Sequence, residues 1–106
     1  ARATYEIDIH KPAGTGTYHC PVPENDYYTI PYRALIPVGA DNLIVAGRPI
    51  SSTHEAHSSF RIMPITSCIG EAAGAAAAIM KKLDCKSIDV PIKQLQDTLV
   101  DYGAHI

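Results

Sequence analysis

Two arginines and a histidine in the middle of this 106-residue chain have the side chains to do chemistry. Arg48 follows a short apolar run and Gly47, and Arg61 directly precedes a long stretch of small residues. Arginine side chains donate paired hydrogen bonds to carboxylates, phosphates or ribityl hydroxyls. His57, which stands four residues before Arg61, could polarise a substrate or relay a proton. Each arginine could equally form a structural ion pair with a nearby carboxylate.

The sequence His54-Glu55-Ala56-His57 suggests a metal site at first sight. A zincin motif needs its two histidines four residues apart on one helical face, whereas these are three apart. The surrounding serines and threonines predict a loop, in which Glu55 would be solvated. The three cysteines lack CxxC spacing and favour neither a disulfide framework nor a structural zinc site. We therefore expect no metal here.

A strand and a helix would position the arginines and the histidine. Leu43–Ala46 is a short continuous apolar run, which predicts a strand that is buried on both faces. We expect a helix from about Pro64 to Leu83, because proline suits the first turn of a helix. Lys81 and Lys82 complement the helix dipole near its far end.

The first turn of that helix is a candidate site for an anion or a carbonyl oxygen. Free N–H groups at Ile65, Thr66 and Ser67 would point towards such a ligand, helped by the positive end of the dipole. Thr66 and Ser67 could instead act as local caps. Gly70 and Gly74 follow in the helix interior, where each glycine costs about 1 kcal/mol relative to alanine. That cost is tolerated where another backbone or a cofactor must approach closely.

The remaining segments predict short strands first and a helix last. Tyr5–Ile9 alternates apolar and polar residues, as a half-buried strand does. Further strand-like segments are Tyr18–Val22, Tyr27–Ile30 and Ala34–Pro37, and turns are expected at Pro12–Gly16, Pro23–Asp26 and Val38–Asp41. We expect a second helix from about Val90 to Tyr102, with Asp89 as N-cap and Gly103 just after its end. Its apolar stripe would consist of Ile92, Leu95, Leu99 and Tyr102.

The composition fits one small globular unit, with 46% hydrophobic and 19% charged residues. A net charge of -2 without a basic cluster argues against nucleic acid and against an anionic membrane surface as partners. The stretch Met63–Met80 is rich in alanine and contains Glu71, so we do not expect it to span a membrane. The chain begins with Ala1 rather than methionine, which suggests a fragment.

The stretch from Ile30 to Ala78 resembles a long motif of FAD-dependent oxidoreductases. It reads IPYRALIPVGADNLIVAGRPISSTHEAHSSFRIMPITSCIGEAAGAAAA. This is similar to the C-terminal part of the flavoprotein superfamily with two dinucleotide-binding domains. The closest likeness is to a bacterial group with the pattern IPYR.L.P, then NL.VAGR.IS..H.AH.S.R.MP, then G.AAG.AAA. The earlier YEIDIHKP and the last helix fit the same region, so the likeness covers most of the chain.

The resemblance implies an α/β fold, or α+β for the isolated piece, from the C-terminal part of an FAD/NAD(P)-binding Rossmann-type fold, with short strands followed by two helices. Residues 1–40 would lie at the edge of the substrate/FAD domain. Residues 41–83 would form the strand, the loop and the flavin-facing helix, and residues 84–106 the C-terminal helix.

The resemblance also implies a role for each candidate residue. Gly47 would let backbone approach the cofactor, and Arg48 would contact the ribityl or phosphate region where relatives carry an acid. The segment Met63, Pro64, Ile65 and Thr66 would lie against the isoalloxazine, with the helix-start amides facing its N1–C2=O2 edge. In fumarate reductases and aspartate oxidases an HGANR-like segment faces the substrate. His57 and Arg61 have the same spacing, which makes them candidate catalytic residues.

A strand–GxGxxG–helix unit that would hold the adenosine half of FAD does not occur in the sequence. We therefore expect a C-terminal fragment whose parent transfers hydride between an unidentified substrate and FAD. The fragment alone should be inactive and should bind FAD weakly or not at all. Its expected partner is the N-terminal FAD-binding portion of the parent, with a homodimer through exposed apolar surface as a further possibility.

Two other readings of the sequence stay open. A small non-enzymatic α+β module could use the Gly/Ala-rich helix to dock a partner. Some sequences of the group carry polysaccharide-lyase names, but we find no sugar-binding aromatic cleft and no lyase-type set of residues in this chain.

Overall fold

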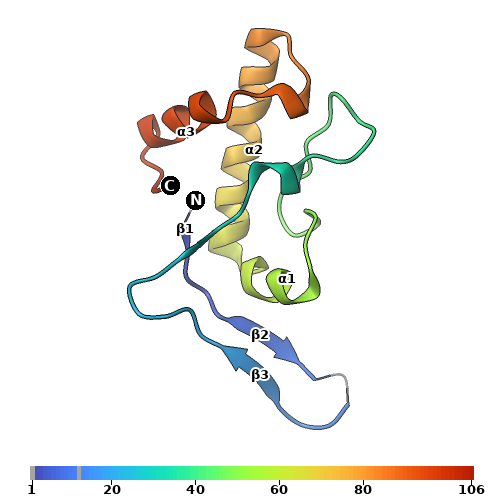
Figure 1. Ribbon diagram of the computed structural model, residues 1–106, viewed down its shortest axis with the longest axis vertical. Coiled ribbons are helices and arrows are strands. Elements are labelled where there is room, and N and C mark those ends of the chain that lie inside the picture. Colours follow the sequence, from blue (N-terminus) through green and yellow to red (C-terminus); the bar gives the residue numbers. More distant parts are fainter. Residues whose placement is uncertain (1, 12) are drawn as a thin grey trace.

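The fold is organised around one long central helix, α2 (Met63–Leu83), in a computed structural model that describes residues 2–11 and 13–106. Helix α3 (Ile92–Asp101) lies across the C-terminal half of α2, and helix α1 (His54–Phe60) lies at its N-terminal end (Figure 1). A hairpin of β2 (Ile7–His10) and β3 (Thr17–Cys20) projects beyond α1 (Figure 1). The two ends of the chain lie close together, with the Arg2 N–H 3.3 Å from the His105 carbonyl oxygen.

Helix α2 agrees with its sequence signals at both ends. Pro64 lies in the first turn, and Lys81 and Lys82 lie in the last turn. The helix stops at Asp84, which adopts a left-handed conformation with φ of 50° and donates its N–H to the Met80 carbonyl. The predicted range from about Pro64 to Leu83 is therefore confirmed.

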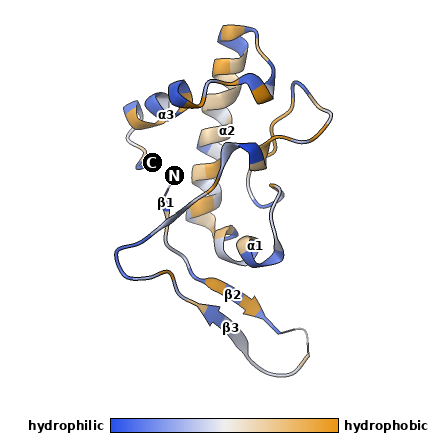
Figure 2. Ribbon diagram, viewed as in Figure 1, coloured by the Kyte–Doolittle hydropathy of each residue, from blue (hydrophilic) through white to orange (hydrophobic). Residues whose placement is uncertain are grey.

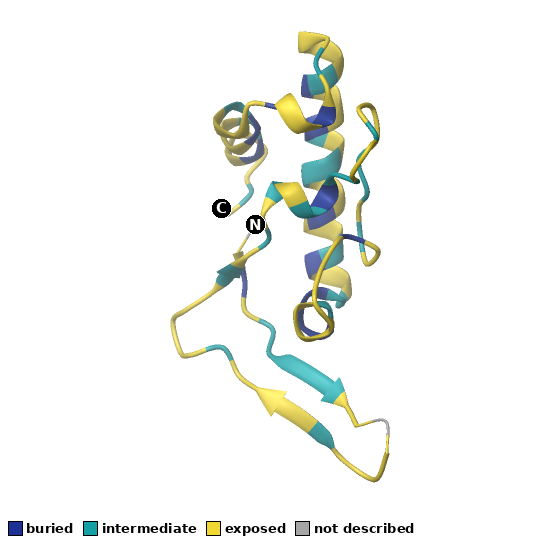
Figure 3. Cartoon of the chain, turned by 45° about the vertical axis from the view of Figure 1, so that its right-hand side comes forward, coloured by how far each residue is buried: buried dark blue, intermediate teal, exposed yellow. Residues whose placement is uncertain are grey.

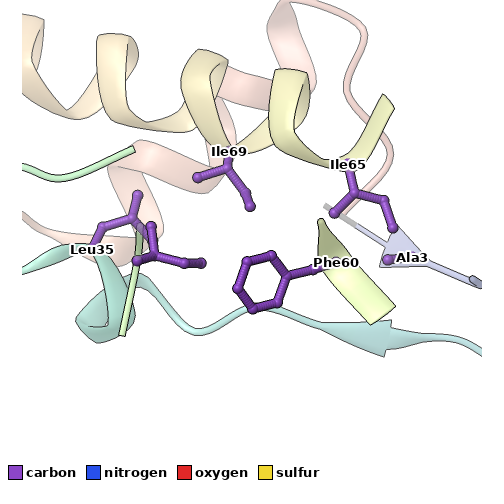
Figure 4. Close-up of a cluster of buried hydrophobic side chains, with 6 residues drawn as sticks. Ala3, Leu35, Phe60, Ile65 and Ile69 are labelled. Atoms are coloured by element: carbon purple, nitrogen blue, oxygen red, sulfur yellow. The ribbon is translucent and has the colours of Figure 1, made fainter. Parts of the chain in front are cut away.

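One face of α2 is buried along its whole length (Figure 3). Near the helix start, Ile65 and Ile69 pack with Phe60 and Leu35 in a first core (Figure 4). Nearer its end, Ala76 and Ile79 pack with the α3 side chains in a second core. The complete buried sets are Ala3, Leu35, Ile50, Phe60, Ile65 and Ile69 for the first core, and Ala76, Ile79, Val90, Leu95 and Leu99 for the second.

The strands form two separate antiparallel pairs. Strand β1 (Arg2–Ala3) pairs with β4 (Tyr28–Thr29), and β2 pairs with β3 so that Ile7 faces Cys20 and His10 faces Thr17. Hydropathy alternates along β2, in which two isoleucines are interspersed with polar residues (Figure 2). The described residues thus have an α+β architecture with three α-helices rather than two. They contain no parallel strand–helix–strand unit, so a Rossmann arrangement is not seen within them.

The prediction of a strand at Leu43–Ala46 is wrong. The segment is irregular, and Leu43 is half exposed rather than buried. Within the described residues, one backbone hydrogen bond joins it to another segment, from the Val45 N–H to the Leu35 carbonyl (2.8 Å). An apolar run becomes a strand only when a neighbouring strand completes its ladder, and the described residues provide none here.

The prediction of an extended segment at Ala34–Pro37 is also wrong for the first half of that segment. Residues Tyr32–Leu35 form a 3₁₀ helix, η1, which starts after extended Pro31 and buries Leu35 in the first core. The Tyr32 hydroxyl donates a hydrogen bond to the Ser87 carbonyl oxygen at 2.9 Å. This contact ties η1 to the second 3₁₀ helix, η2 (Ser87–Asp89). The other expected strands and turns appear within a few residues of their predicted places, although Pro12 lies outside the described residues.

Helix α3 begins later than expected, because Asp89 belongs to η2 and Pro91 takes the N-cap position without a side-chain cap. Of the predicted apolar stripe, Leu95 and Leu99 are buried, whereas Ile92 and Tyr102 are exposed. The end of the helix is as predicted. Gly103 has φ of +89°, and the N–H groups of residues 103 and 104 return to the carbonyls of residues 100 and 99. This pair of bonds is a Schellman motif.

Glycine substitutions in and after these helices should have opposite effects. Gly70 and Gly74 have no atom within 4 Å of a built Cβ, so alanine at either position should stabilise the chain by about 1 kcal/mol. Alanine at Gly103 should destabilise it by about 1 kcal/mol, because φ is +89° there. Urea unfolding followed by circular dichroism measures all three variants. Destabilisation by the first two would show that α2 is packed more closely than the structure indicates.

By length and apolar composition α2 could also cross a membrane. Its buried face, however, carries both cores of the structure, and Glu71 lies exposed on its other side. In this fold α2 therefore acts as the central core helix.

Candidate functional site

Helix α1 carries His57 and places Arg61 directly after its end. The segment expected as a loop is helical, because the Thr53 hydroxyl accepts a hydrogen bond from the Ala56 N–H and Glu55 lies in the first turn. A threonine followed by an acid in the next positions is the sequence signal that could have revealed this helix. The Arg61 N–H donates to the His57 carbonyl at 3.1 Å, so the two residues lie one turn apart on one helical face.

The side chains of His57 and Arg61 nevertheless turn to different neighbours. The His57 ring is half-buried and packs edge-on against Phe60, with ring centroids 5.4 Å apart. The Arg61 guanidinium donates from Nη2 to the Asp8 carboxylate Oδ2 and from Nε to the Ser58 carbonyl, each at 3.3 Å. Asp8 lies on β2, 53 residues away in the sequence, so no local pattern could have predicted this ion pair.

Arg48 also contacts the C-terminal end of α1. Its Nε–H donates to the Arg61 carbonyl at 2.8 Å. Both arginines therefore use Nε to satisfy carbonyls at the C-terminal end of α1, where the helix dipole favours positive charge. Within the described residues, four of the five N–H groups of Arg48 and three of those of Arg61 have no protein partner. The predicted arginines are thus brought together at the α1–α2 junction.

The start of α2 lies directly after Arg61 and has no side-chain cap and no acid in its first turn. Within the described residues, the N–H groups of Met63 and Ile65 have no partner, and Pro64 has no N–H to offer. Met63 is 74% exposed, whereas the Ile65 side chain is buried in the first core. Ile65 can therefore contribute only its backbone N–H to a ligand.

The prediction that the Thr66 N–H is free is wrong. Thr66 donates its N–H to the Ile62 carbonyl at 3.0 Å, and its hydroxyl lies within hydrogen-bond distance of the Ile62 and Met63 carbonyls. A hydroxyl that donates to carbonyls does not cap free N–H groups, so the alternative role of Thr66 as a cap is also wrong. Ser67 lies one position further into the helix and does not cap it either.

Gly47 turns the chain just before Arg48, with φ of +79°. A Cβ at this position would meet only the Pro49 ring, at 3.9 Å, so the space in front of the backbone is open. The conformation itself requires glycine. Gly47 thus leaves room for the backbone to approach a ligand.

An exposed stripe of small residues continues from the N-terminus of α2 along its outer face. Gly70 and Gly74 are both exposed, and no atom of the described residues lies within 4 Å of a Cβ built at either one. The close packing considered for these glycines is therefore not made inside the chain. We call Ser67, Gly70, Gly74, Ala77 and Ala78 the small-residue face.

A cavity of about 860 Å³ lies between η1, α2 and α3 rather than at Arg48 and Arg61. Pro64 and Ile65 belong to its lining, together with core residues such as Leu35 and Leu99. Gly47, Arg48, His57 and Arg61 do not line this cavity. The described residues contain no group of three His, Cys, Asp or Glu side chains that could hold a metal ion.

A buried hydroxyl network fixes the β2 segment to α1. The Ser59 hydroxyl donates to the Tyr5 carbonyl, which can only accept, and the Tyr28 hydroxyl lies 2.8 Å from the same Ser59 oxygen. The Ser58 hydroxyl lies 3.3 Å from the Asp8 N–H and accepts its hydrogen bond. Burial raises the pKa of the Tyr28 hydroxyl above its ordinary value of 10.0. This network holds Asp8 beside Arg61.

Alkaline pH should weaken the fold through its partly buried tyrosines. Burial raises the pKa of Tyr32, with a smaller contribution from Cys85, above the value of 10.0 that the residue has when unfolded. The folded chain therefore binds this proton more tightly, and the resulting stability is complete below pH 10 and lost as the pH rises above it. Urea unfolding from pH 8 to 11 should show a smaller alkaline loss in Tyr32→Phe than in wild type. The exposed Tyr102→Phe is the control, and equal losses in both variants would contradict the assignment.

Residues 1–99 match the family model described as FAD dependent oxidoreductase. No curated protein and no solved structure matches the chain. The family match covers every element up to Leu99, including α1, the start of α2 and both arginines. The chain belongs to the FAD-dependent oxidoreductase family.

Proposed function

We propose that this chain forms the flavin-facing part of an FAD-dependent oxidoreductase that transfers hydride between a substrate and FAD. The observation that carries the proposal is the uncapped start of α2 beside two arginines with free N–H groups. Family membership supplies the cofactor, because members of the family are flavoproteins. The site residues and their roles are part of the proposal.

The positive charge and the free N–H groups at the α1–α2 junction support the proposal of a flavin there. A flavin that accepts hydride gains negative charge near its N1–C2=O2 edge, and the N–H groups of Met63 and Ile65 would face that edge. The positive end of the α2 dipole stabilises such charge. Gly47 offers open backbone beside it, and Arg48 has four free N–H groups for ribityl or phosphate oxygens. Met63, Pro64 and Thr66 would lie along the ring system.

On the substrate side, Arg61 would bind a negatively charged group and His57 would polarise the substrate or relay a proton. Arg61 keeps three N–H groups free after its contacts with Asp8 and Ser58. His57 is half-buried against Phe60, which limits the motion of its ring. The two residues come from the same helix end, so a substrate could contact both.

The adenosine half of FAD needs a second portion of protein. The sequence lacks a GxGxxG motif, and the small-residue face of α2 is exposed in this chain. We propose that the N-terminal FAD-binding portion of a parent protein packs on this face. The 106-residue chain alone is then inactive and binds FAD weakly or not at all.

Reconstitution tests this proposal. The chain is mixed with a separately produced FAD-binding portion of the parent that carries the GxGxxG motif, and the mixture is passed through a gel-filtration column. The expected result is a complex with the visible absorbance of bound flavin, while the chain alone emerges colourless. Stoichiometric flavin on the chain alone, or its self-association without any flavin-bearing complex, would count against the proposal.

A further inference from the structure

Asp8 forms an ion pair with Arg61, but it has no role in the flavin and substrate contacts proposed above. Asp8 lies on β2, and its side chain is 13% exposed, whereas that of Arg61 is 37% exposed. The carboxylate Oδ2 accepts from Arg61 Nη2 and from the Tyr5 hydroxyl, each at 3.3 Å. The second oxygen, Oδ1, is buried and has no hydrogen-bond partner among the described residues. A buried carboxylate with one unpartnered oxygen is costly and calls for a role.

The contacts fix one edge of the Arg61 guanidinium and leave the other free. Nε donates to the Ser58 carbonyl and Nη2 to Asp8, so both bonds lie on the same edge of the planar group. The Nη1 group carries no bond to any described residue. Such a fixed fork suits a carboxylate, which binds arginine through two parallel N–H···O bonds. Without Asp8 the fork would rotate about the long arginine side chain.

The β2–β3 hairpin is anchored to α1 at Asp8 itself. The Asp8 N–H donates to the Ser58 hydroxyl, and the Ser58 hydroxyl lies 2.7 Å from the Glu55 carbonyl in α1. Ser58 is only 5% exposed, so this attachment is part of the packed structure. The position of Asp8 relative to α1 is thereby set independently of Arg61.

We propose that Asp8 is a positioning residue that orients Arg61 to bind a carboxylate group of the substrate. The proposal rests on the substrate-side role of Arg61 proposed above. Asp8 does not touch the substrate, and it acts by holding one edge of the guanidinium. Simple electrostatics would make the opposite prediction, because removing a negative charge near Arg61 should strengthen anion binding.

The test follows the Arg61 Nε–H by NMR in the 106-residue chain and in Asp8→Asn and Asp8→Ala. Sodium acetate is the probe, with sodium chloride at matched ionic strength as the comparison. The order parameter of the Arg61 Nε–H should be highest in wild type, lower in Asp8→Asn, which keeps one acceptor oxygen, and lowest in Asp8→Ala. The preference of Arg61 for acetate over chloride should fall about tenfold in Asp8→Ala.

Equal Arg61 order in all three proteins, or stronger acetate preference in the variants, would overturn the positioning role. If Asp8→Ala fails to fold, Asp8→Asn still decides, because the isosteric amide preserves packing. The amide signals of α3 report folding in every sample. An ordered Arg61 that ignores acetate in the wild type would instead refute the substrate role on which this inference rests.

Discussion

Leucine in place of Gly74 should weaken the assembly of this chain with an FAD-binding portion, while leaving the chain itself folded. Gly74 is exposed, and apart from the adjacent backbone of α2 no atom of the described residues lies within 4 Å of a built Cβ, so the isolated chain has room for the larger side chain. Leucine is also the better helix former. At a close backbone contact the added atoms would cost about 1–3 kcal/mol, which weakens assembly about 5- to 150-fold.

Isothermal titration of the FAD-loaded portion with each variant measures this effect. Gly74→Ala should fall between wild type and Gly74→Leu, because the size of the added group sets the cost. Lys82→Leu adds the same side chain to the exposed last turn of α2 and serves as the matched control. Unchanged affinity for Gly74→Leu would mean that the small-residue face is not the contact surface.

Alanine in place of Phe60 should have the largest effect on stability. Phe60 is 3% exposed, and its ring lies among Leu35, Ile65 and Ile69 in the first core (Figure 4). Removing a buried phenylalanine costs about 3–5 kcal/mol, which is a large part of the total stability of a small domain. The His57 ring also loses its edge-on partner. We therefore expect a lower urea midpoint of unfolding. We also expect disorder around His57 and Arg61, the residues proposed to face the substrate.

Leu99→Ala in the second core is the comparison for Phe60→Ala, since Leu99 is 6% exposed. Amide hydrogen exchange should show lost protection in α1 and at the start of α2 for Phe60→Ala, and in α3 for Leu99→Ala. If both variants lost protection evenly over the whole chain, the two cores would form one cooperative unit. A loss of stability below about 1 kcal/mol for Phe60→Ala would contradict the packing described here.

The sequence predicted those elements whose signals are local. The bounds of α2 follow from Pro64 and the two lysines at its end, and the Schellman ending of α3 follows from Gly103. Elements that depend on distant partners were predicted less well. Leu43–Ala46 has the composition of a strand, but a strand also needs a neighbour, and composition cannot supply one.

The candidate site shows the same division between local and distant information. The spacing of His57 and Arg61 made them candidate catalytic residues by resemblance, but helix α1, which carries His57 and ends just before Arg61, was missed because its signal is only Thr53 and Glu55. The contact of Arg61 with Asp8 joins residues 53 apart and has no sequence signature. Family resemblance pointed to the arginines, whereas only the structure identified the aspartate that holds one of them.

The most direct test of the central claim is to locate the flavin relative to the start of α2. In the reconstituted complex, the amide NMR signals of this chain are compared between oxidised and reduced flavin. We predict that the largest changes in amide chemical shift occur at Gly47, Arg48, Met63 and Ile65, where the backbone is expected to face the ring system. Shifts centred on α3 or on the β2–β3 hairpin, with none at the start of α2, would contradict it.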